Sequence, residues 1–274
     1  MKNVSDIVLL TDMDGTLLPP SKIPSQQDLV SIKRFVAAGG RFSVATGRAL
    51  QSVAQYFGEI QVNFPAIMCN GALVYDINEK CGKMNVYLPT STKDIIAKIL
   101  KDNPNIGCEI LTIDHVYVPQ LNEAESTHIS IAKVTPDYIP IEDTPPDKWY
   151  KALFADKQEK TDKLVEYVAK QNFEGVDFVR SSKHYYEILP KNISKGSCVD
   201  FIREHYCTDS DVIICAGDYH NDIEMLKAAD IAVCPSNAVD AVKEVCDIVL
   251  ESSCEQNAIA ELIDGILDGS LIKK

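Results

Sequence analysis

The sequence has no run of basic residues, no hydrophobic run long enough to span a membrane, and no closely spaced pair of cysteines. Lys and Arg number 27 against 40 Asp and Glu, which gives a net charge of −13. A surface that binds nucleic-acid phosphates needs clustered Lys and Arg, and a membrane-spanning helix needs about 20 consecutive apolar residues. We therefore expect neither a nucleic-acid partner nor a membrane-embedded segment.

The nine cysteines are scattered, without metal-binding spacing, and most lie in apolar runs. This pattern favours buried thiols in a reducing compartment. The apolar run at residues 7–10 is too short for the core of a signal peptide and is soon followed by Asp12. The sequence thus predicts a soluble, cytoplasmic protein.

A chain of 274 residues with 46% hydrophobic and 24% charged residues is long enough for two domains, or for one domain with a large insertion. Short apolar runs alternate with amphipathic helices at both ends of the chain. This alternation predicts an α/β fold with a Rossmann-like parallel sheet that is covered on both faces. The expected strands are 7–10, 42–45, 66–69, 212–216, 231–233 and 248–250, and the expected helices are 26–38, 50–57, 198–206, 221–228 and 239–245.

The middle of the chain has a different pattern, in which strands outnumber helices. We expect an α+β domain inserted into the α/β core, with connections at 76–82 and 190–193. The predicted core is 1–83 and 188–274, and the predicted cap is 84–187. Within the cap, the expected strands are 106–111, 116–118, 150–154, 176–179 and 185–189, and the expected helices are 92–100 and 159–170.

Two aspartates follow the first predicted strand, in the segment Thr11-Asp12-Met13-Asp14-Gly15-Thr16. Strand side chains alternate with period two, so Asp12 and Asp14 project to one side if the strand geometry continues that far. Crowded carboxylates repel each other unless a cation or a proton relieves them. The alternative is a simple turn, because Asp-Gly is a strong turn dipeptide.

A second acidic segment, Gly217-Asp218-Tyr219-His220-Asn221-Asp222, follows the apolar run 212–216. It suits a helix N-terminus, where carboxylates accept amide hydrogen bonds, and this role is compatible with a functional one. If Asp218 lies beside the first strand, Asp12, Asp14 and Asp218 form a group of hard oxygen ligands. Mg²⁺ prefers such ligands and accepts substrate phosphate as well.

Two further segments fit phosphoryl transfer. Thr46 and Gly47 end the second predicted strand and offer a hydroxyl and backbone amides at a helix start, where anions bind. Lys195 opens the helix after the insertion, where a cation neutralises a transferring phosphoryl group. Each segment alone is common, and an isolated lysine is more often a solvated surface residue.

The order DxDGT, TGR, lysine and GDxxND, each after a predicted strand or opening a helix, resembles the haloacid dehalogenase superfamily of aspartate-nucleophile phosphatases. The segment 70–76, Asn-Gly-Ala-Leu-Val-Tyr-Asp, is similar to its Cof-type branch, which carries an α/β cap inserted after the third core strand. The resemblance implies a Mg²⁺-dependent phosphatase that hydrolyses small cytoplasmic phosphomonoesters, such as a sugar phosphate, through an aspartyl-phosphate.

The resemblance also implies a role for each matching residue. Asp12 is the expected nucleophile and Asp14 the expected general acid and base, with Thr46 and Lys195 completing the catalytic set. Mg²⁺ is expected to be held by the Asp12 carboxylate, the Asp14 carbonyl and Asp218, with Asp222 or Asn221 in support. The expected phosphate-binding residues are Met13 through its amide, Thr46, Gly47, Arg48, Lys195 and Asn221, although Arg48 is equally suited to bracing its own loop.

One segment departs from the family pattern: Pro235 and Ser236 stand where a small, flexible pair is usual, while Asn237 and Ala238 match. Two alternatives to hydrolysis remain at this point. A phosphomutase of the same superfamily carries the same pair of aspartates, and a non-enzymatic phosphate sensor also gathers carboxylates and a lysine at strand ends. The cap sequence carries no recognisable signal for the substrate.

Overall fold

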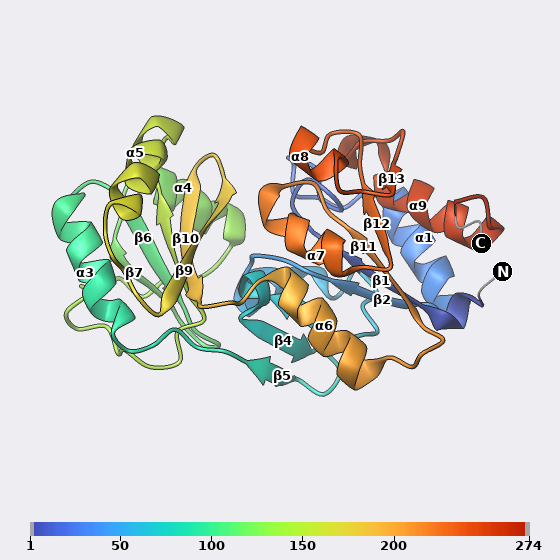
Figure 1. Cartoon of the computed structure of the whole chain (residues 1–274), viewed down its shortest axis with the longest axis horizontal. Helices are drawn as coiled ribbons and strands as arrows, with labels where there is room; N and C mark the ends of the chain where they lie inside the picture. Colours follow the sequence, from blue (N-terminus) through green and yellow to red (C-terminus); the bar gives the residue numbers. More distant parts are fainter. Residues whose placement is uncertain (1–2, 272–274) are drawn as a thin grey trace. The chain divides into compact units, whose positions relative to one another are not determined.

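The computed structural model describes residues 3–271, which form two compact units (Figure 1). The first unit consists of the chain up to Thr46, Ala54–Met84, and the chain from Ser194 onward. The second consists of Gly47–Val53 and Asn85–Ile193. No helix within residues 3–271 combines the length and the apolar character needed to cross a membrane.

The first unit is built on a five-stranded parallel sheet. Its order is β13 (Ile248–Val249), β12 (Ile231–Cys234), β11 (Val212–Ala216), β1 (Ile7–Thr11) and β2 (Arg41–Val44). A parallel bridge between Ala45 and Ile67 continues the sheet to β3 (Ala66–Met68). Strand β3 in turn belongs to a small sheet with β4 (Leu73–Asp76) and β5 (Cys81–Asn85).

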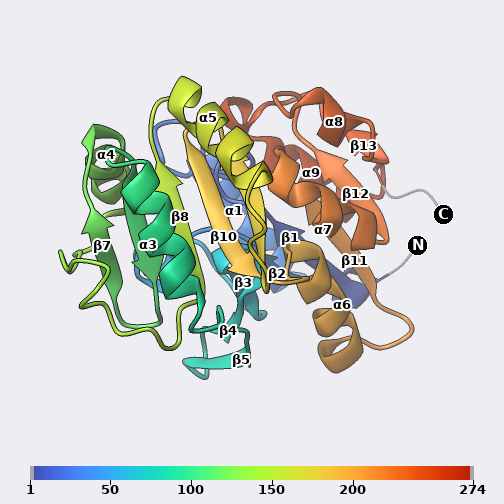
Figure 2. The same ribbon diagram turned by 60° about the vertical axis from the view of Figure 1, so that its left-hand side comes forward.

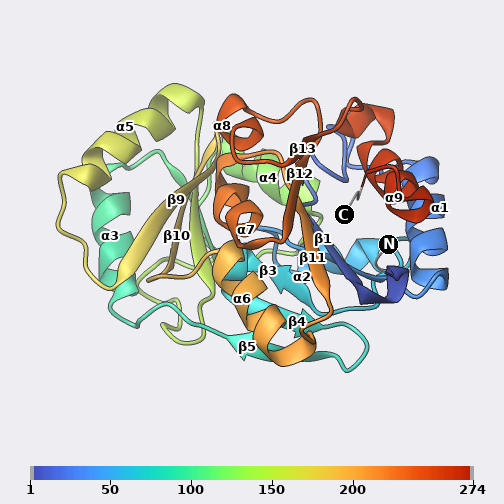
Figure 3. The ribbon, with the colours of Figure 1, turned by 45° about the vertical axis from the view of Figure 1, so that its right-hand side comes forward.

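Strand β1 is an interior strand of this sheet, and all five of its residues are buried. It pairs with β11 on one side and β2 on the other, and Thr11 aligns with Ala216 and Val44. Helices cover both faces, with α6 (Lys195–Tyr206) and α7 (Ile223–Ala228) on one and α1 (Gln26–Ala37) and α9 (Ala258–Asp268) on the other (Figure 3). The carboxyl ends of β1, β2 and β11 therefore meet at one edge, where α/β sheets bind ligands.

The helices of the first unit have between 4 and 12 residues, and two of them, α7 and α9, follow a 3₁₀ turn. The α-helices are α1 (Gln26–Ala37), α6 (Lys195–Tyr206), α7 (Ile223–Ala228), α8 (Asp240–Lys243) and α9 (Ala258–Asp268). The 3₁₀ turns are Val4–Asp6, Ala54–Tyr56, Cys69–Gly71, His220–Asp222 and Cys254–Gln256.

The second unit is an antiparallel five-stranded sheet with helices on both faces (Figure 2). The sheet order is β7 (Val116–Gln120), β6 (Gly107–Leu111), β8 (Lys151–Ala155), β10 (Tyr185–Pro190) and β9 (Val176–Ser182). Its helices are α3 (Thr92–Asp102), α4 (Glu123–Ala132) and α5 (Gln158–Ala169), and the short α2 (Leu50–Val53) is grouped with it.

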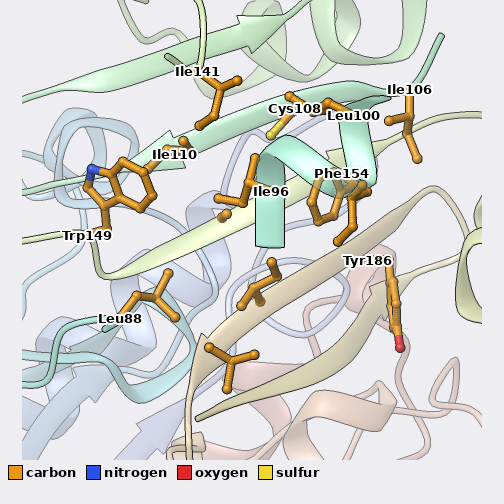
Figure 4. Packing of buried hydrophobic residues seen from close by; sticks show 14 of the residues in the cluster. Leu88, Ile96, Leu100, Ile106, Cys108, Ile110, Ile141, Trp149, Phe154 and Tyr186 are labelled. Carbon is orange, nitrogen blue, oxygen red and sulfur yellow. The ribbon is translucent and has the colours of Figure 1, made fainter. Parts of the chain in front are cut away.

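Alternation along the strands gives this sheet one apolar and one partly charged face. Cys108, Ile110 and Phe154 pack against α3 and α5 in the main core of the unit (Figure 4). Trp149, which is 1% exposed, belongs to the same cluster and so has a packing role. Glu109 and Lys151 project to the opposite face, where α4 packs.

The α/β core and the α+β middle segment agree with the sequence-based expectation. The division of the chain differs in detail: the expected boundary at 187 falls inside β10, which pairs with β8 and β9 on either side and stays with the second unit. The expected connection 76–82 contains the end of β4 and the start of β5. The expected helix 50–57 is α2 followed by a 3₁₀ turn.

Candidate active site

Three predicted segments converge at the carboxyl edge of the parallel sheet. Asp12 directly follows β1, and its N–H donates to the Ala216 carbonyl at 2.8 Å. Asp218 follows β11 by two residues, after Gly217, whose N–H donates to the Val233 carbonyl at 3.2 Å. These backbone bonds continue the sheet past its last regular residue, so both aspartates start from fixed positions.

The carboxylates of Asp12, Asp218 and Asp222 form a compact group, in which one oxygen from each lies within 4.8 Å of the others. Asp12 is 5% exposed and Asp222 is fully buried. Three clustered carboxylate oxygens match the ligand chemistry of Mg²⁺. The residues present therefore fit a divalent cation.

Lys195, the first residue of α6, lies between two of these aspartates. Its Nζ donates to Asp12 Oδ1 and to Asp222 Oδ1, both at 2.6 Å, and its side chain is fully buried. The Ser194 side chain caps the helix by accepting a hydrogen bond from the Ser197 N–H, which fixes the start of the helix at Lys195. The alternative of a solvated surface lysine is therefore wrong, because Lys195 is a buried ion-pair centre.

Asp222 supports the other aspartates through its second oxygen. Asp222 Oδ2 accepts the N–H groups of Asp218 at 3.0 Å and of Tyr219 at 3.1 Å. With Oδ1 engaged by Lys195, both of its oxygens are already bonded. Asp222 thus holds the Asp218 backbone and the Lys195 ammonium, which favours a supporting role over direct ligation.

Burial and crowding shift the ionisation of the whole group. Burial raises the pKa of Asp12 well above its ordinary value; Lys195 opposes this shift, and the neighbouring carboxylates add to it. Burial, together with the Asp222 charge, raises the pKa of Asp218 to about 7. Burial alone would lower the pKa of Lys195, but Asp12 and Asp222 outweigh it and raise the pKa. A divalent cation would relieve the repulsion among the carboxylates.

Asp14 takes a different position from the one that strand alternation predicts. Strand β1 ends at Thr11, so the period-two pattern does not extend to Asp14. The Asp14 side chain is 35% exposed, and its Oδ1 accepts from Lys22 Nζ at 2.6 Å. Among the described residues, the side-chain group that could hold a metal contains Asp12, Asp218 and Asp222 but not Asp14. This placement is compatible with the expected ligation through the Asp14 carbonyl.

Several contacts that sequence reasoning missed organise the loop after β1. Thr16 Oγ1 donates to Asp218 Oδ1 at 3.0 Å. Asn237 Nδ2 donates to the Gly15 carbonyl at 2.8 Å, while Asn237 Oδ1 accepts the Cys254 N–H. The loop that departs from the family pattern is thereby tied to Gly15. Single polar residues in loops have no periodicity, so only the DxDGT match marked Thr16.

The expected phosphate-binding residues are divided between the two units: Met13, Thr46, Lys195 and Asn221 belong to the first, and Gly47 and Arg48 to the second. Thr46 is buried, but its N–H donates to the Ile67 carbonyl at 2.8 Å and helix α2 starts only at Leu50, so its amide is not a free helix-start donor. The Met13 carbonyl accepts the N–H groups of Leu17 and Leu18, which closes the turn after Asp12. Asn221 Nδ2 donates to Asn70 Oδ1 at 3.1 Å.

Gly47 and Arg48 belong by their contacts to the second unit. Arg48 Nη1 donates to Ser52 Oγ at 3.0 Å, one helical turn later. Of the two roles considered for Arg48, this contact favours bracing its own loop. His220, inside the second acidic segment, is exposed.

Comparison with known proteins places these features in a family context. A family model described as haloacid dehalogenase-like hydrolase matches residues 9–263. Two relatives come from Bacillus subtilis strain 168, and both are named 5-amino-6-(5-phospho-D-ribitylamino)uracil phosphatase. YwtE is 28% identical over 94% of this chain and 97% of its own. YitU is 25% identical over 93% and 96%.

A solved structure shows the same architecture. The crystal structure of TM0651 from Thermotoga maritima has a TM-score of 0.79 and 27% identity, and the match covers 100% of this chain and 98% of that one. The whole length of the fold, with its middle unit, is therefore shared.

Proposed function

The chain belongs to the haloacid dehalogenase-like hydrolases and is a phosphatase, and on that premise we propose that it hydrolyses small phosphomonoesters through an aspartyl-phosphate on Asp12, with Mg²⁺ bound. The observation that carries the proposal is the buried contact of Lys195 with Asp12 and Asp222 beside Asp218. A buried cation held by two aspartates is a prepared electrostatic site for a phosphoryl group.

The metal would be held by the carboxylates of Asp12 and Asp218 and by the Asp14 carbonyl. Asp222 would support these ligands through its contacts with Lys195 and the Asp218 N–H. When bound, Mg²⁺ supplies positive charge that lets an anionic nucleophile approach an anionic phosphate. Lys195 orients the Asp12 carboxylate through Oδ1 and shares in neutralising the phosphoryl oxygens. Thr46 and Asn221 are proposed to bind those oxygens.

The proposed reaction has two steps. First, an Asp12 carboxylate oxygen forms a bond to phosphorus while the bond to the leaving oxygen breaks, and Asp14 donates its proton to that oxygen. Second, Asp14 takes a proton from water as the water oxygen bonds to phosphorus, and phosphate leaves Asp12. Asp14 is accessible enough for both transfers, since its side chain is 35% exposed.

The proposed substrate is a phosphorylated small molecule from the cytoplasm. The two Bacillus relatives are named for a phosphoribitylamino-uracil, which makes a phosphorylated polyol or sugar the first class to test here. A cytoplasmic location is supported by nine cysteines that are all free thiols.

The test is phosphate release from an aryl phosphate and from a panel of sugar, polyol and nucleotide phosphates, with Mg²⁺ or with EDTA. We expect Asp12→Asn to lose at least a thousandfold in kcat, since removing a covalent nucleophile removes several kcal/mol of barrier lowering. Asp209→Asn, an exposed aspartate in a loop, is the matched control and should retain full activity.

Two results would contradict hydrolysis. Substrate turnover without free phosphate, with the phosphoryl group returned to a product, would identify a phosphomutase. Binding of phosphate without turnover by the wild type would identify a sensor.

A further inference from the structure

The turn at Cys69–Gly71, in the first unit, has three consecutive residues with positive φ. Cys69 and Asn70 both have positive φ angles, 52° and 55°, and Gly71 follows at 104°. Consecutive left-handed residues other than glycine are costly and persist only where surrounding contacts enforce them. All three residues are buried, so these contacts come from the interior of the first unit.

The turn contacts each of the segments proposed to bind the phosphoryl group. The Asn70 N–H donates to the Thr46 carbonyl at 3.1 Å. The Asn70 side chain accepts from Asn221 Nδ2. A Cβ at Gly71 would overlap the Ser194 carbonyl, and Cys198 Sγ donates to the Gly71 carbonyl at 3.0 Å, so the turn also packs on the start of α6.

We propose that Asn70 is a positioning residue that sets the orientation of the Asn221 side chain toward the phosphoryl group. Asn70 Oδ1 is a hydrogen-bond acceptor, so it fixes the Asn221 side chain with its NH₂ group toward Asn70. The second N–H of this NH₂ group is then directed away from Asn70. Without Asn70, the Asn221 amide can rotate. The left-handed backbone is needed because it directs a 2% exposed side chain at Asn221.

This inference rests on the proposed function and is tested by the variant Asn70→Gly. Glycine adopts positive φ freely, so the substitution removes the side chain without adding strain. The expected result is a loss of about fivefold in kcat/KM and a similar rise in the inhibition constant of inorganic phosphate, as for one lost hydrogen bond. Lys80→Gly is the matched control, because Lys80 also has a positive φ (53°) but lies exposed in the turn between β4 and β5.

The decisive comparison is a double-mutant cycle with Asn221→Ala. If Asn70 acts through Asn221, adding Asn70→Gly to the Asn221→Ala variant produces no further loss in kcat/KM or phosphate affinity. Urea unfolding of each variant separates this effect from stability. Equal losses from Asn70→Gly in both backgrounds, or wild-type kinetics for Asn70→Gly, would overturn the proposal.

The two proposals fail in distinguishable ways. If the wild type releases no phosphate from any substrate, the proposed function fails before any variant is compared. Calorimetric titration with inorganic phosphate in the presence of Mg²⁺ still measures the double-mutant cycle of Asn70 and Asn221, since phosphate binding requires no turnover. Wild-type turnover with an additive cycle would contradict the role of Asn70 alone.

Discussion

Gly15, in the turn after Asp12, lies so close to the Asp218 carboxylate that no side chain fits at this position. Its φ is +95°, which side chains rarely adopt, and a Cβ there would overlap the Asp218 carboxylate. Its carbonyl also accepts from Asn237. The Asp-Gly turn and the carboxylate group are therefore one structure: the turn that sequence alone offered as an alternative is what brings Asp218 close to the chain after Asp12.

We expect Gly15→Ala to weaken Mg²⁺ binding at least tenfold, because the added methyl group displaces the Asp218 carboxylate. The strained backbone should also cost about 1–3 kcal/mol of stability. Calorimetric titration with Mg²⁺ and urea unfolding measure the two effects. Gly58→Ala is the control, since a Cβ at Gly58 would have no atom within 4 Å apart from those of its own residue and its two chain neighbours. Unchanged Mg²⁺ affinity in Gly15→Ala would contradict this account of the turn.

The order of the four motifs predicted one site for Asp12, Asp218 and Lys195, and the structure brings these three residues together. The sequence did not reveal that Lys22 pairs with Asp14, or that Asn70 contacts Asn221. Lys22 and Asn70 both have left-handed backbones, and although the Asn70-Gly71 dipeptide signals a turn, it does not show which side chain Asn70 contacts. Such contacts depend on tertiary structure.

At the scale of elements, the sequence did not predict helices α4 and α9 or strand β5, and each omission has a physical reason. Helix α4 buries Glu125 completely, so a polar residue occupies a position where the helical pattern calls for an apolar one. Helix α9 contains Gly265, which argues against a helix in sequence, yet the Leu271 side chain fills the space that a Cβ would occupy. Strand β5 is mostly half-exposed and has no apolar run.

Glu125 also makes the stability of the second unit dependent on pH. Burial, and then the adjacent Glu109, raise the pKa of Glu125 to about 10, against 4.5 for an ordinary glutamate. Between these values the folded protein holds a proton that the unfolded chain releases. Stability is therefore greatest below pH 4.5 for this group and falls as the pH rises toward 10.

We expect Glu125→Gln to flatten this decline, because glutamine keeps the shape without a titrating proton. Urea unfolding of the second unit at pH 6, 7, 8 and 9 should show a wild-type slope steeper than that of the variant by up to about 1.4 kcal/mol per pH unit. Glu123→Gln, an exposed glutamate on the same helix, is the control. Parallel pH profiles for wild type and Glu125→Gln would contradict the buried-proton interpretation.

At the scale of the whole molecule, the two units carry separate chemistry: the carboxylate group lies in the first and the buried Glu109–Glu125 pair in the second. A ligand that binds only the folded first unit stabilises that unit by mass action. Mg²⁺ should therefore act on the unfolding of the first unit, whereas the titration of Glu125 acts on the unfolding of the second.

We expect Mg²⁺ at a hundred times its dissociation constant to stabilise the first unit by about 2.7 kcal/mol. Scanning calorimetry should show this as an upward shift of the first-unit transition in the wild type and in Asp209→Asn. Asp218→Asn should show no shift, because a carboxylate ligand is lost. An equal Mg²⁺ shift in Asp218→Asn would place the metal elsewhere.

The central claim is that Asp12 carries the phosphoryl group during turnover, and an acid-quench experiment on Asp14→Asn tests it most directly. An aryl leaving group needs no proton, so this variant should still form the aspartyl-phosphate but hydrolyse it slowly. Mass spectrometry of the quenched protein should then find one phosphoryl group on the peptide that contains Asp12. A phosphoryl group on another residue, or steady turnover with no phosphorylated protein, would contradict the mechanism.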